Sequence, residues 1–319
     1  MDYLVTGGAG FIGSHLIEYL LSENHHIYCL DNFNDYYDPA IKWKNIENAR
    51  RQPSFQLIEG DILDEALLEK IFENHHFDGI VHLAARAGVR PSVLQPKLYQ
   101  EVNIRGTLNL LELAKQYQIK KFVFASSSSV YGNNKKVPFS ESDPVDNPIS
   151  PYAATKKTGE LICYTYSALY SISISCLRFF TVYGPRQRPD MAIHKFTKLI
   201  AAGKDIPIYG DGKSKRDFTY ISDIIAGVVR SLERCTGYHI YNLGESRVIG
   251  LMELIGLIES NLGQKAKIKW LAPQPGDVAI TYADITKAKN ELDFHPKVTI
   301  EAGIKAFVTW FKEHNLNQT

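Results

Sequence analysis

The first 31 residues constrain the fold of this chain most strongly. An apolar run, residues 1–6, leads into a glycine-rich turn, and a second apolar run, residues 27–30, ends at Asp31. An amphipathic segment, residues 14–22, lies between them. This order predicts a strand, a turn, a helix and a second strand, which together form a β-α-β unit. Since parallel strands need such a crossover, the segment predicts a parallel sheet.

The glycine turn and the acid after it predict a dinucleotide site. Gly7, Gly10 and Gly13 follow one another at a spacing of three. Gly7 suits a tight turn, Gly10 lets a pyrophosphate approach the backbone, and Gly13 allows close packing of the helix. The helix N-terminus offers unpaired N–H groups to phosphates. Asp31 can accept a hydrogen bond from a ribose 2′-OH and would repel a 2′-phosphate, so the pattern predicts NAD rather than NADP.

Strand and helix patterns alternate along the rest of the chain. We expect an α/β fold with a doubly wound parallel sheet (Rossmann) in residues 1–182 and a smaller C-terminal α/β domain, which binds the substrate, in residues 183–319. The border is expected to be interleaved, with strands of the second part returning to the first sheet. Strands are expected at 55–58, 79–83, 121–125, 173–180, 206–209 and 238–243, and helices at 39–51, 64–72, 97–117, 151–170, 192–202, 222–234, 251–262 and 300–314.

Composition excludes several classes of partner. The formal net charge of the 319 residues is +1, so no overall field favours nucleic acid or a membrane surface. No apolar run approaches the length of a membrane span, and no signal-type segment precedes the first strand. The four cysteines form no close pair, which predicts buried free thiols, no metal site and a cytoplasmic location.

Tyr152 and Lys156 predict acid–base chemistry. Both lie in the helix that Pro151 is expected to open, and positions four apart share one helix face. A phenol has a pKa of about 10, but a neighbouring ammonium and a positive nicotinamide ring both favour the phenolate. A phenolate can take the proton of an alcohol while hydride passes to NAD. Taken alone, such a pair is more often an ordinary surface feature.

A run of four serines supports the chemical interpretation. Residues 126–129 end a predicted strand, and ligands bind at the carboxyl ends of parallel strands. Their hydroxyls can bond a sugar hydroxyl or a carboxylate. In an unrelated fold the same run would be a serine-rich turn.

The sequence resembles the extended short-chain dehydrogenase/reductase family along essentially its whole length. The matching residues are 6–13, Asp61, 82–85, Asn103, the serine run, the Tyr152/Lys156 pair and 183–185. The resemblance implies that Tyr152 is the acid and base, that Lys156 binds the nicotinamide ribose, and that Ser127 orients the substrate hydroxyl, a role that Ser128 or Ser129 could share. The expected NAD-binding residues are Gly7, Gly10, Phe11, Ile12, Gly13, Asp31, Asn32, Asp61, Ile62, Leu83, Ala84, Ala85, Tyr152 and Lys156.

Within that family the sequence is most similar to nucleotide-sugar 4-epimerases that act on UDP-sugar acids. The similarity lies in residues 87–90, 177–192 and 274–278. Family members that remove water carry an Asp-Glu pair where this chain has serines, so dehydration is not expected. Arg86 departs from the glutamine that is usual in these epimerases. The alternatives are a 4-epimerase of UDP-glucose or UDP-N-acetylglucosamine and a UDP-glucuronate decarboxylase.

The resemblance also implies substrate contacts and an assembly. Arg216 is similar to the arginine that grips the UDP phosphates, and Asp277 to the acid that contacts the UDP ribose. Either Arg186 or Arg188 could reach the sugar carboxylate, or both could be solvated loop charges. The remaining expected contacts come from Arg90 and Thr181. Helices 97–117 and 151–170 are also expected to pair with their symmetry mates in a homodimer, because each carries more apolar residues than one helix face can bury. These residues are Leu108, Leu110, Leu111 and Leu113 on the first helix, and Leu161, Ile162, Tyr166 and Leu169 on the second.

Overall fold

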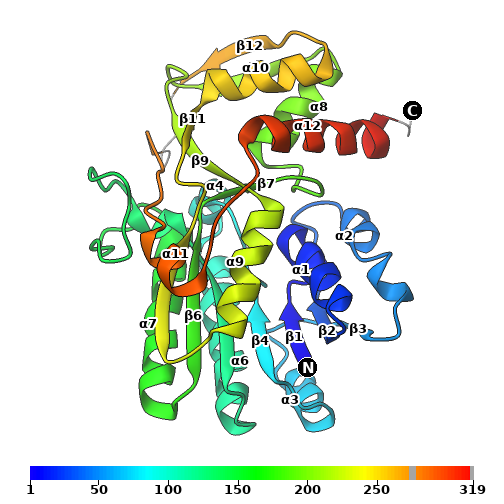
Figure 1. The fold of residues 1–319 in the computed structure, drawn as a ribbon, viewed down its shortest axis with the longest axis vertical. Coiled ribbons are helices and arrows are strands. Elements are labelled where there is room, and N and C mark those ends of the chain that lie inside the picture. Colours follow the sequence, from blue (N-terminus) through cyan, green and yellow to red (C-terminus); the bar gives the residue numbers. More distant parts are fainter. Residues whose placement is uncertain (273–277, 317–319) are drawn as a thin grey trace.

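The computed structural model describes residues 1–272 and 278–316, and its centre is a parallel sheet of seven strands (Figure 1). Every pairing in this sheet is parallel. The doubly wound fold expected from the sequence is therefore confirmed. In spatial order the strands are β10 (Tyr238–Leu243), β6 (Ser173–Phe179), β5 (Lys121–Ser127), β4 (Gly79–His82), β1 (Asp2–Thr6), β2 (His26–Asp31) and β3 (Phe55–Glu59).

Helices cover both faces of the sheet. The helices α1 (Phe11–Ser22) and α9 (Ile221–Glu233) share one apolar core with Val5 and Val123. The opposite face, with Leu4 and Phe122, packs against α3 (Glu65–Asn74), α6 (Gly106–Gln116) and α7 (Pro151–Tyr170). Successive strand residues point to opposite faces, so strands that are buried on both faces are apolar throughout.

The two halves of the chain are interleaved. Strand β10 and helix α9 come from the second half, yet β10 completes one edge of the main sheet beside β6. Most of the remaining second half forms a smaller body, drawn at the top of Figure 1, with its own apolar core. Its elements are β7 (Thr181–Tyr183), α8 (Ala192–Ala201), β8 (Asp205–Tyr209), β9 (Lys215–Tyr220), β11 (Val248–Gly250), α10 (Leu251–Leu262), β12 (Lys267–Leu271) and α12 (Ile300–Phe311).

The helix expected at 97–117 is not continuous. It consists of α5 (Pro96–Gln100), a π-helical turn (Glu101–Arg105) and α6. The wider turn carries the buried Asn103, whose side chain accepts from the Arg86 amide and donates to the Arg86 carbonyl and to Thr155 on α7. The distances are 2.8, 3.0 and 3.0 Å. A π-turn of this kind often marks a functional site.

Other boundaries differ in ways that have local causes. The helix expected at 39–51 is divided in two: α2 spans Pro39–Asn45, and a separate short helix spans Ala49–Arg51. The Asn45 side chain turns inward and donates to the Ala9 carbonyl. Strands β9 and β12 were not expected, because their sequences are too charged to show the strand pattern. The short helices α4 (Val89–Leu94) and α11 (Thr286–Leu292) were also not expected.

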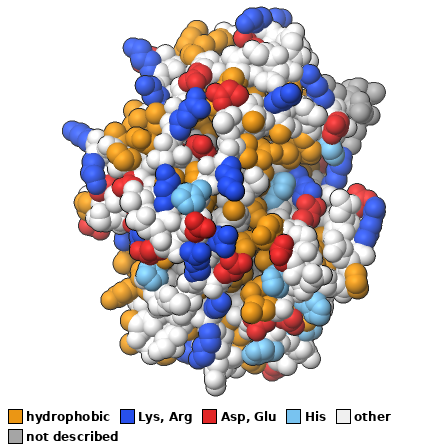
Figure 2. Space-filling model, in the orientation of Figure 1, with side chains coloured by type: hydrophobic (Ala, Val, Ile, Leu, Met, Phe, Trp, Pro, Cys, Tyr) orange, Lys and Arg blue, Asp and Glu red, His pale blue; other side chains and the backbone are white. Residues whose placement is uncertain are grey.

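Charged side chains of both signs lie on the surface. Figure 2 shows acidic and basic side chains interspersed over one face of the molecule. None of the helices within the described residues combines the length and the apolar character that crossing a membrane would require. All four cysteines are free and buried, as expected.

Candidate active site

A cavity of about 440 Å³ opens at the carboxyl ends of the strands, where the strand order reverses between β1 and β4. Ligands of doubly wound sheets bind at such a reversal. All fourteen residues expected to bind NAD line this cavity, and so do Ser127, Ser128, Ser129, Thr181 and Arg188.

The glycine turn forms one end of the cavity. Gly7 has a φ of +70°, and a Cβ atom on it would lie 2.7 Å from the Ala84 nitrogen. A Cβ atom on Gly13 would lie 2.4 Å from the Gly7 carbonyl oxygen, so Gly13 allows the helix to pack against the turn itself. Gly10 caps α1 without a side chain, which leaves the first N–H groups of the helix open to the cavity. This end therefore fits a pyrophosphate.

Asp31 is held rigidly at the ribose end of the site. Its carboxylate accepts hydrogen bonds from the Ala9 amide (3.2 Å) and the Phe33 amide (2.9 Å). The Lys42 ammonium lies 3.5 Å from the same carboxylate, and both side chains are buried. Burial lowers the pKa of Lys42, and Asp31 opposes that shift. Sequence reasoning missed Lys42, because a lysine in a predicted helix carries no signal of such a contact.

Tyr152 and Lys156 stand on α7 beside the end of β5. The buried Lys156 ammonium donates to the Ala125 carbonyl at 2.7 Å, and burial lowers the pKa of Lys156 to about 8. It lies 6.0 Å from the centroid of the Tyr152 ring. Burial raises the pKa of Tyr152, whereas the hydrogen bond with Ser127 and the charge of Arg188 lower it. Ser127 and Arg188 thus oppose the effect of burial on the Tyr152 phenol.

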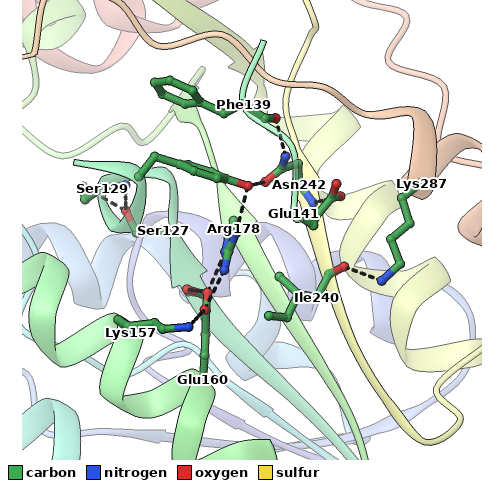
Figure 3. Close-up of polar contacts among 12 residues, drawn as sticks. Ser127, Ser129, Phe139, Glu141, Lys157, Glu160, Arg178, Ile240, Asn242 and Lys287 are labelled. Atoms are coloured by element: carbon green, nitrogen blue, oxygen red, sulfur yellow. Dashed lines mark hydrogen bonds and ion pairs between the residues drawn. The ribbon is translucent and has the colours of Figure 1, made fainter. Parts of the chain in front are cut away.

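The serines divide between two directions. Ser126 also lines the cavity, but its hydroxyl donates to Glu160 at 2.6 Å. Ser127 and Ser129 form a local pair in which the Ser127 hydroxyl donates to the Ser129 hydroxyl and accepts from the Ser129 amide, both at 3.1 Å (Figure 3). Hydroxyls 127–129 therefore form the polar wall of the cavity next to Tyr152.

The structure separates the arginines that the sequence grouped. Arg188 lines the cavity, is paired with Asp190 by two bonds of 2.9 Å, and lies over the Tyr36 ring at 5.5 Å. Arg186 does not line the cavity, because it pairs with Glu18 of α1 at 2.7 and 2.9 Å.

Two other expected substrate residues, Arg90 and Arg216, do not line the cavity. Arg90 packs over the Tyr209 ring at 4.5 Å, and Arg216 donates to the Lys215 and Ala279 carbonyls. Asp277 lies outside the described residues.

Several lining residues were missing from the sequence prediction. Tyr36 and Tyr37 follow Asp31 in a polar, aromatic stretch, which was a weak signal, and Met191 gave none. Arg86, noted only as a departure from related sequences, also lines the cavity. Within residues 1–272 and 278–316, no three His, Cys, Asp or Glu side chains are grouped so that they could hold a metal ion.

The sequence and the fold both match known proteins. Residues 4–307 match the family described as GDP-mannose 4,6 dehydratase. The chain belongs to this family.

Relatives within the family carry a more specific description. The chain is 47% identical over 313 residues to UDP-glucuronate 4-epimerase of Thermodesulfobacterium geofontis. The match covers 98% of this chain and 96% of that relative. The structure of UDP-glucuronic acid 4-epimerase from Bacillus cereus with UDP-glucuronic acid and NAD is 38% identical, with a TM-score of 0.91 and coverage of 98% and 99%. The structure of UDP-glucose 4-epimerase from Thermotoga maritima with UDP-glucose is 34% identical, with a TM-score of 0.91 and coverage of 98% and 99%.

Proposed function

We propose that this protein is an NAD-dependent isomerase that interconverts UDP-glucuronate and UDP-galacturonate through a 4-keto sugar. The observation that carries the proposal is that Tyr152 and the serine wall share one cavity with the glycine turn and Asp31. The relatives described as UDP-glucuronate 4-epimerases support the choice of substrate. The arrangement suits the oxidation and reduction of one sugar carbon beside a bound dinucleotide.

The residues of the cavity have distinct tasks in this reaction. The Tyr152 phenolate takes the proton of the 4-hydroxyl, and Ser127 orients that hydroxyl. When bound by the glycine turn, Asp31 and Lys156, NAD would supply the acceptor for the C4 hydride, and its reduced form would supply the donor for the opposite face of the 4-keto sugar. Tyr152 then returns the proton to the new 4-hydroxyl, while Lys156 holds the nicotinamide ribose.

The sugar carboxylate needs its own contacts. A ketone at C4 is β to the C6 carboxylate, and such an acid loses carbon dioxide when the C5–C6 bond stands perpendicular to the carbonyl plane. Ser128, Ser129 and Thr181 line the cavity and can bond the carboxylate, with Arg188 as the charged partner. Restraining the carboxylate keeps the reaction an epimerisation.

The proposal extends to the setting of the enzyme. We infer a homodimer in the cytoplasm that supplies a sugar-acid nucleotide for polysaccharide biosynthesis. The absence of a strong net charge fits a small-molecule substrate better than nucleic acid or a membrane.

Proton NMR of the NAD-loaded protein with UDP-glucuronate tests the activity. We expect UDP-galacturonate to form until both epimers stand at equilibrium, and Tyr152→Phe to slow this by on the order of 100- to 10,000-fold. Release of carbon dioxide with a pentose nucleotide would instead indicate a decarboxylase. Faster conversion of UDP-glucose or UDP-N-acetylglucosamine would indicate a neutral-sugar epimerase, the alternative that the Thermotoga maritima structure favours. A single unchanged epimer with every substrate would reject all three activities.

A further inference from the structure

A buried ion pair lies directly behind the serine wall. Arg178 of β6 donates from Nε and Nη2 to the two carboxylate oxygens of Glu160 on α7, both at 2.8 Å (Figure 3). Each side chain is only 1% exposed. The Lys157 ammonium lies 3.9 Å from the same carboxylate. No step of the proposed reaction uses this pair.

The pair is bonded to both ends of the segment that carries the serines. At one end, Ser126 donates to Glu160 at 2.6 Å. At the other end, Arg178 donates from Nη1 to the Tyr131 hydroxyl at 2.9 Å, and its guanidinium lies 4.8 Å from the centre of that ring. The Tyr131 hydroxyl in turn donates to Asn242 of β10 at 2.7 Å. Residues 127–130 thus lie between two residues, Ser126 and Tyr131, that are each bonded to the same ion pair. We call these two residues the anchors.

The same pair is part of the helix that carries the acid and base. Tyr152, Lys156 and Glu160 follow one another at intervals of four on α7, so they share one face of the helix. Lys156 holds the Ala125 carbonyl at 2.7 Å, and Glu160 holds the next residue of β5, Ser126, at 2.6 Å. The distance between α7 and the serine wall therefore depends on these contacts.

Stability alone does not explain such a pair. Removing two charges from water is expensive, and apolar side chains of similar volume are often at least as stabilising as a buried ion pair. Its bidentate geometry, by contrast, fixes both position and orientation.

We propose that Glu160 and Arg178 are positioning residues that hold serines 127–129 in the position from which they face Tyr152. Their effect on catalysis rests on the proposed function, whereas their effect on the serine segment does not. Because a displacement of about 1 Å can slow a reaction by on the order of 100-fold, a modest shift of the wall would be visible in kcat.

The central test replaces both charges at once. Glu160→Met combined with Arg178→Met removes both buried charges together and breaks the bonds from the pair to Ser126 and Tyr131. We expect kcat for UDP-glucuronate to fall by roughly 10- to 100-fold and KM to rise by less, because Ser127 orients the reacting hydroxyl whereas Ser128 and Ser129 share the carboxylate with Thr181 and Arg188. Hydrogen exchange should accelerate at the amides of residues 127–131 and remain unchanged in β1.

Two milder variants cut the anchors and leave the pair intact. Ser126→Ala removes the bond to Glu160, and Tyr131→Phe removes the bonds to Arg178 and Asn242. Each should lower kcat about 2- to 10-fold, less than the double variant, because each releases only one end of the serine segment. They decide the question if the double variant does not fold.

Ile258→Ala supplies the matched control. Ile258 is fully buried in α10, within the core of the smaller body and away from the serine wall. It should lower the melting temperature without changing kcat or exchange in residues 127–131. Equal kcat losses in this control and in the charge replacement would overturn the proposal, as would unchanged kcat in both anchor variants. If the wild-type protein epimerises no UDP-sugar, the proposed function fails, and hydrogen exchange alone decides whether the pair positions the segment.

Discussion

At the scale of the residue, Lys156 illustrates a conflict between stability and chemistry. Burial lowers its pKa to about 8, whereas an unfolded lysine titrates at about 10.4. Below about pH 8 the folded protein holds an unfavourable charge, which lowers the free energy of unfolding by on the order of 3 kcal/mol. Since the unfolded chain keeps its proton longer, this penalty shrinks as the pH rises from about 8 to about 10.4.

Lys156→Met should therefore stabilise the NAD-free protein near neutral pH and abolish most of its activity. The lost charge-assisted bond to the Ala125 carbonyl offsets about 1.5–3 kcal/mol of this gain, so the net gain is small. Urea denaturation at about pH 7 and about pH 9.5 measures the effect, and the gain should be smaller at the higher pH. A variant that is less stable than wild type at both pH values would contradict this expectation.

Thr181 tests the restraint of the sugar carboxylate. Thr181→Ala should increase the fraction of turnovers that release carbon dioxide or leave NADH on the enzyme, because one hydrogen bond to the carboxylate is lost. Such a loss corresponds to about 0.5–1.5 kcal/mol, which is a severalfold change in the partition. Trapped carbon dioxide and absorbance of NADH are the measurements, with Tyr152→Phe as the control that stops both paths. Slow epimerisation without extra carbon dioxide would show that other groups restrain the carboxylate.

At the scale of the element, the segment after β7 is fastened to the dinucleotide helix. Arg186 pairs with Glu18 of α1, and His15 of α1 donates to the Pro185 carbonyl at 3.0 Å. Burial and the charge of Arg186 lower the pKa of His15 to about 4, so its ring is neutral. Arg188, two residues after Arg186, lines the cavity. The Arg186–Glu18 and His15–Pro185 contacts thus fix the position of Arg188.

A double-mutant cycle of Glu18→Ala and Arg186→Ala should give a coupling energy of about 1 kcal/mol, since the pair is partly exposed and screened. Glu18→Ala alone should also raise KM for UDP-glucuronate by loosening Arg188, and it leaves the Arg186 guanidinium without its acid. Denaturation midpoints and initial rates provide the two measurements. Independent effects of the two substitutions would show that the contact does not act as a unit.

At the scale of the whole molecule, α6 and α7 keep exposed apolar side chains. Leu161, Tyr164 and Leu169 of α7 are 55, 57 and 66% exposed, and Leu108 of α6 is 38% exposed. Four apolar residues that the sequence assigned to the interface are instead buried within the subunit; they are Leu110, Leu111 and Leu113 of α6 and Tyr166 of α7. The apolar side chains that remain exposed on α6 and α7 still favour self-association through these helices.

Light scattering should therefore find a dimer at micromolar concentration, and Leu161→Glu should convert it to a monomer. The matched control is Met252→Glu, which places the same charge at a 44% exposed apolar residue of α10. It should leave the mass unchanged. A monomeric wild-type protein would contradict the expected assembly.

The sequence by itself determined the features that depend on spacing within one element. The glycine turn, the acid at the end of β2 and the four-residue interval between Tyr152 and Lys156 belong to single strands, turns or helices, whose periods are read directly from the chain. The order of apolar strands and amphipathic helices likewise predicted the parallel sheet. These features were sufficient to bring the cofactor-binding and acid–base residues to one edge.

Only the tertiary structure decided which side chains meet across elements. Arg186 and Arg188 are two residues apart, but a positive φ of 63° at Arg186 turns the backbone so that one faces Glu18 and the other the cavity. Ser126 and Ser127 are neighbours, yet one bonds Glu160 on α7 and the other faces Tyr152. Such contacts depend on the path of each loop and on the distance between packed elements, and neither is encoded by a local period.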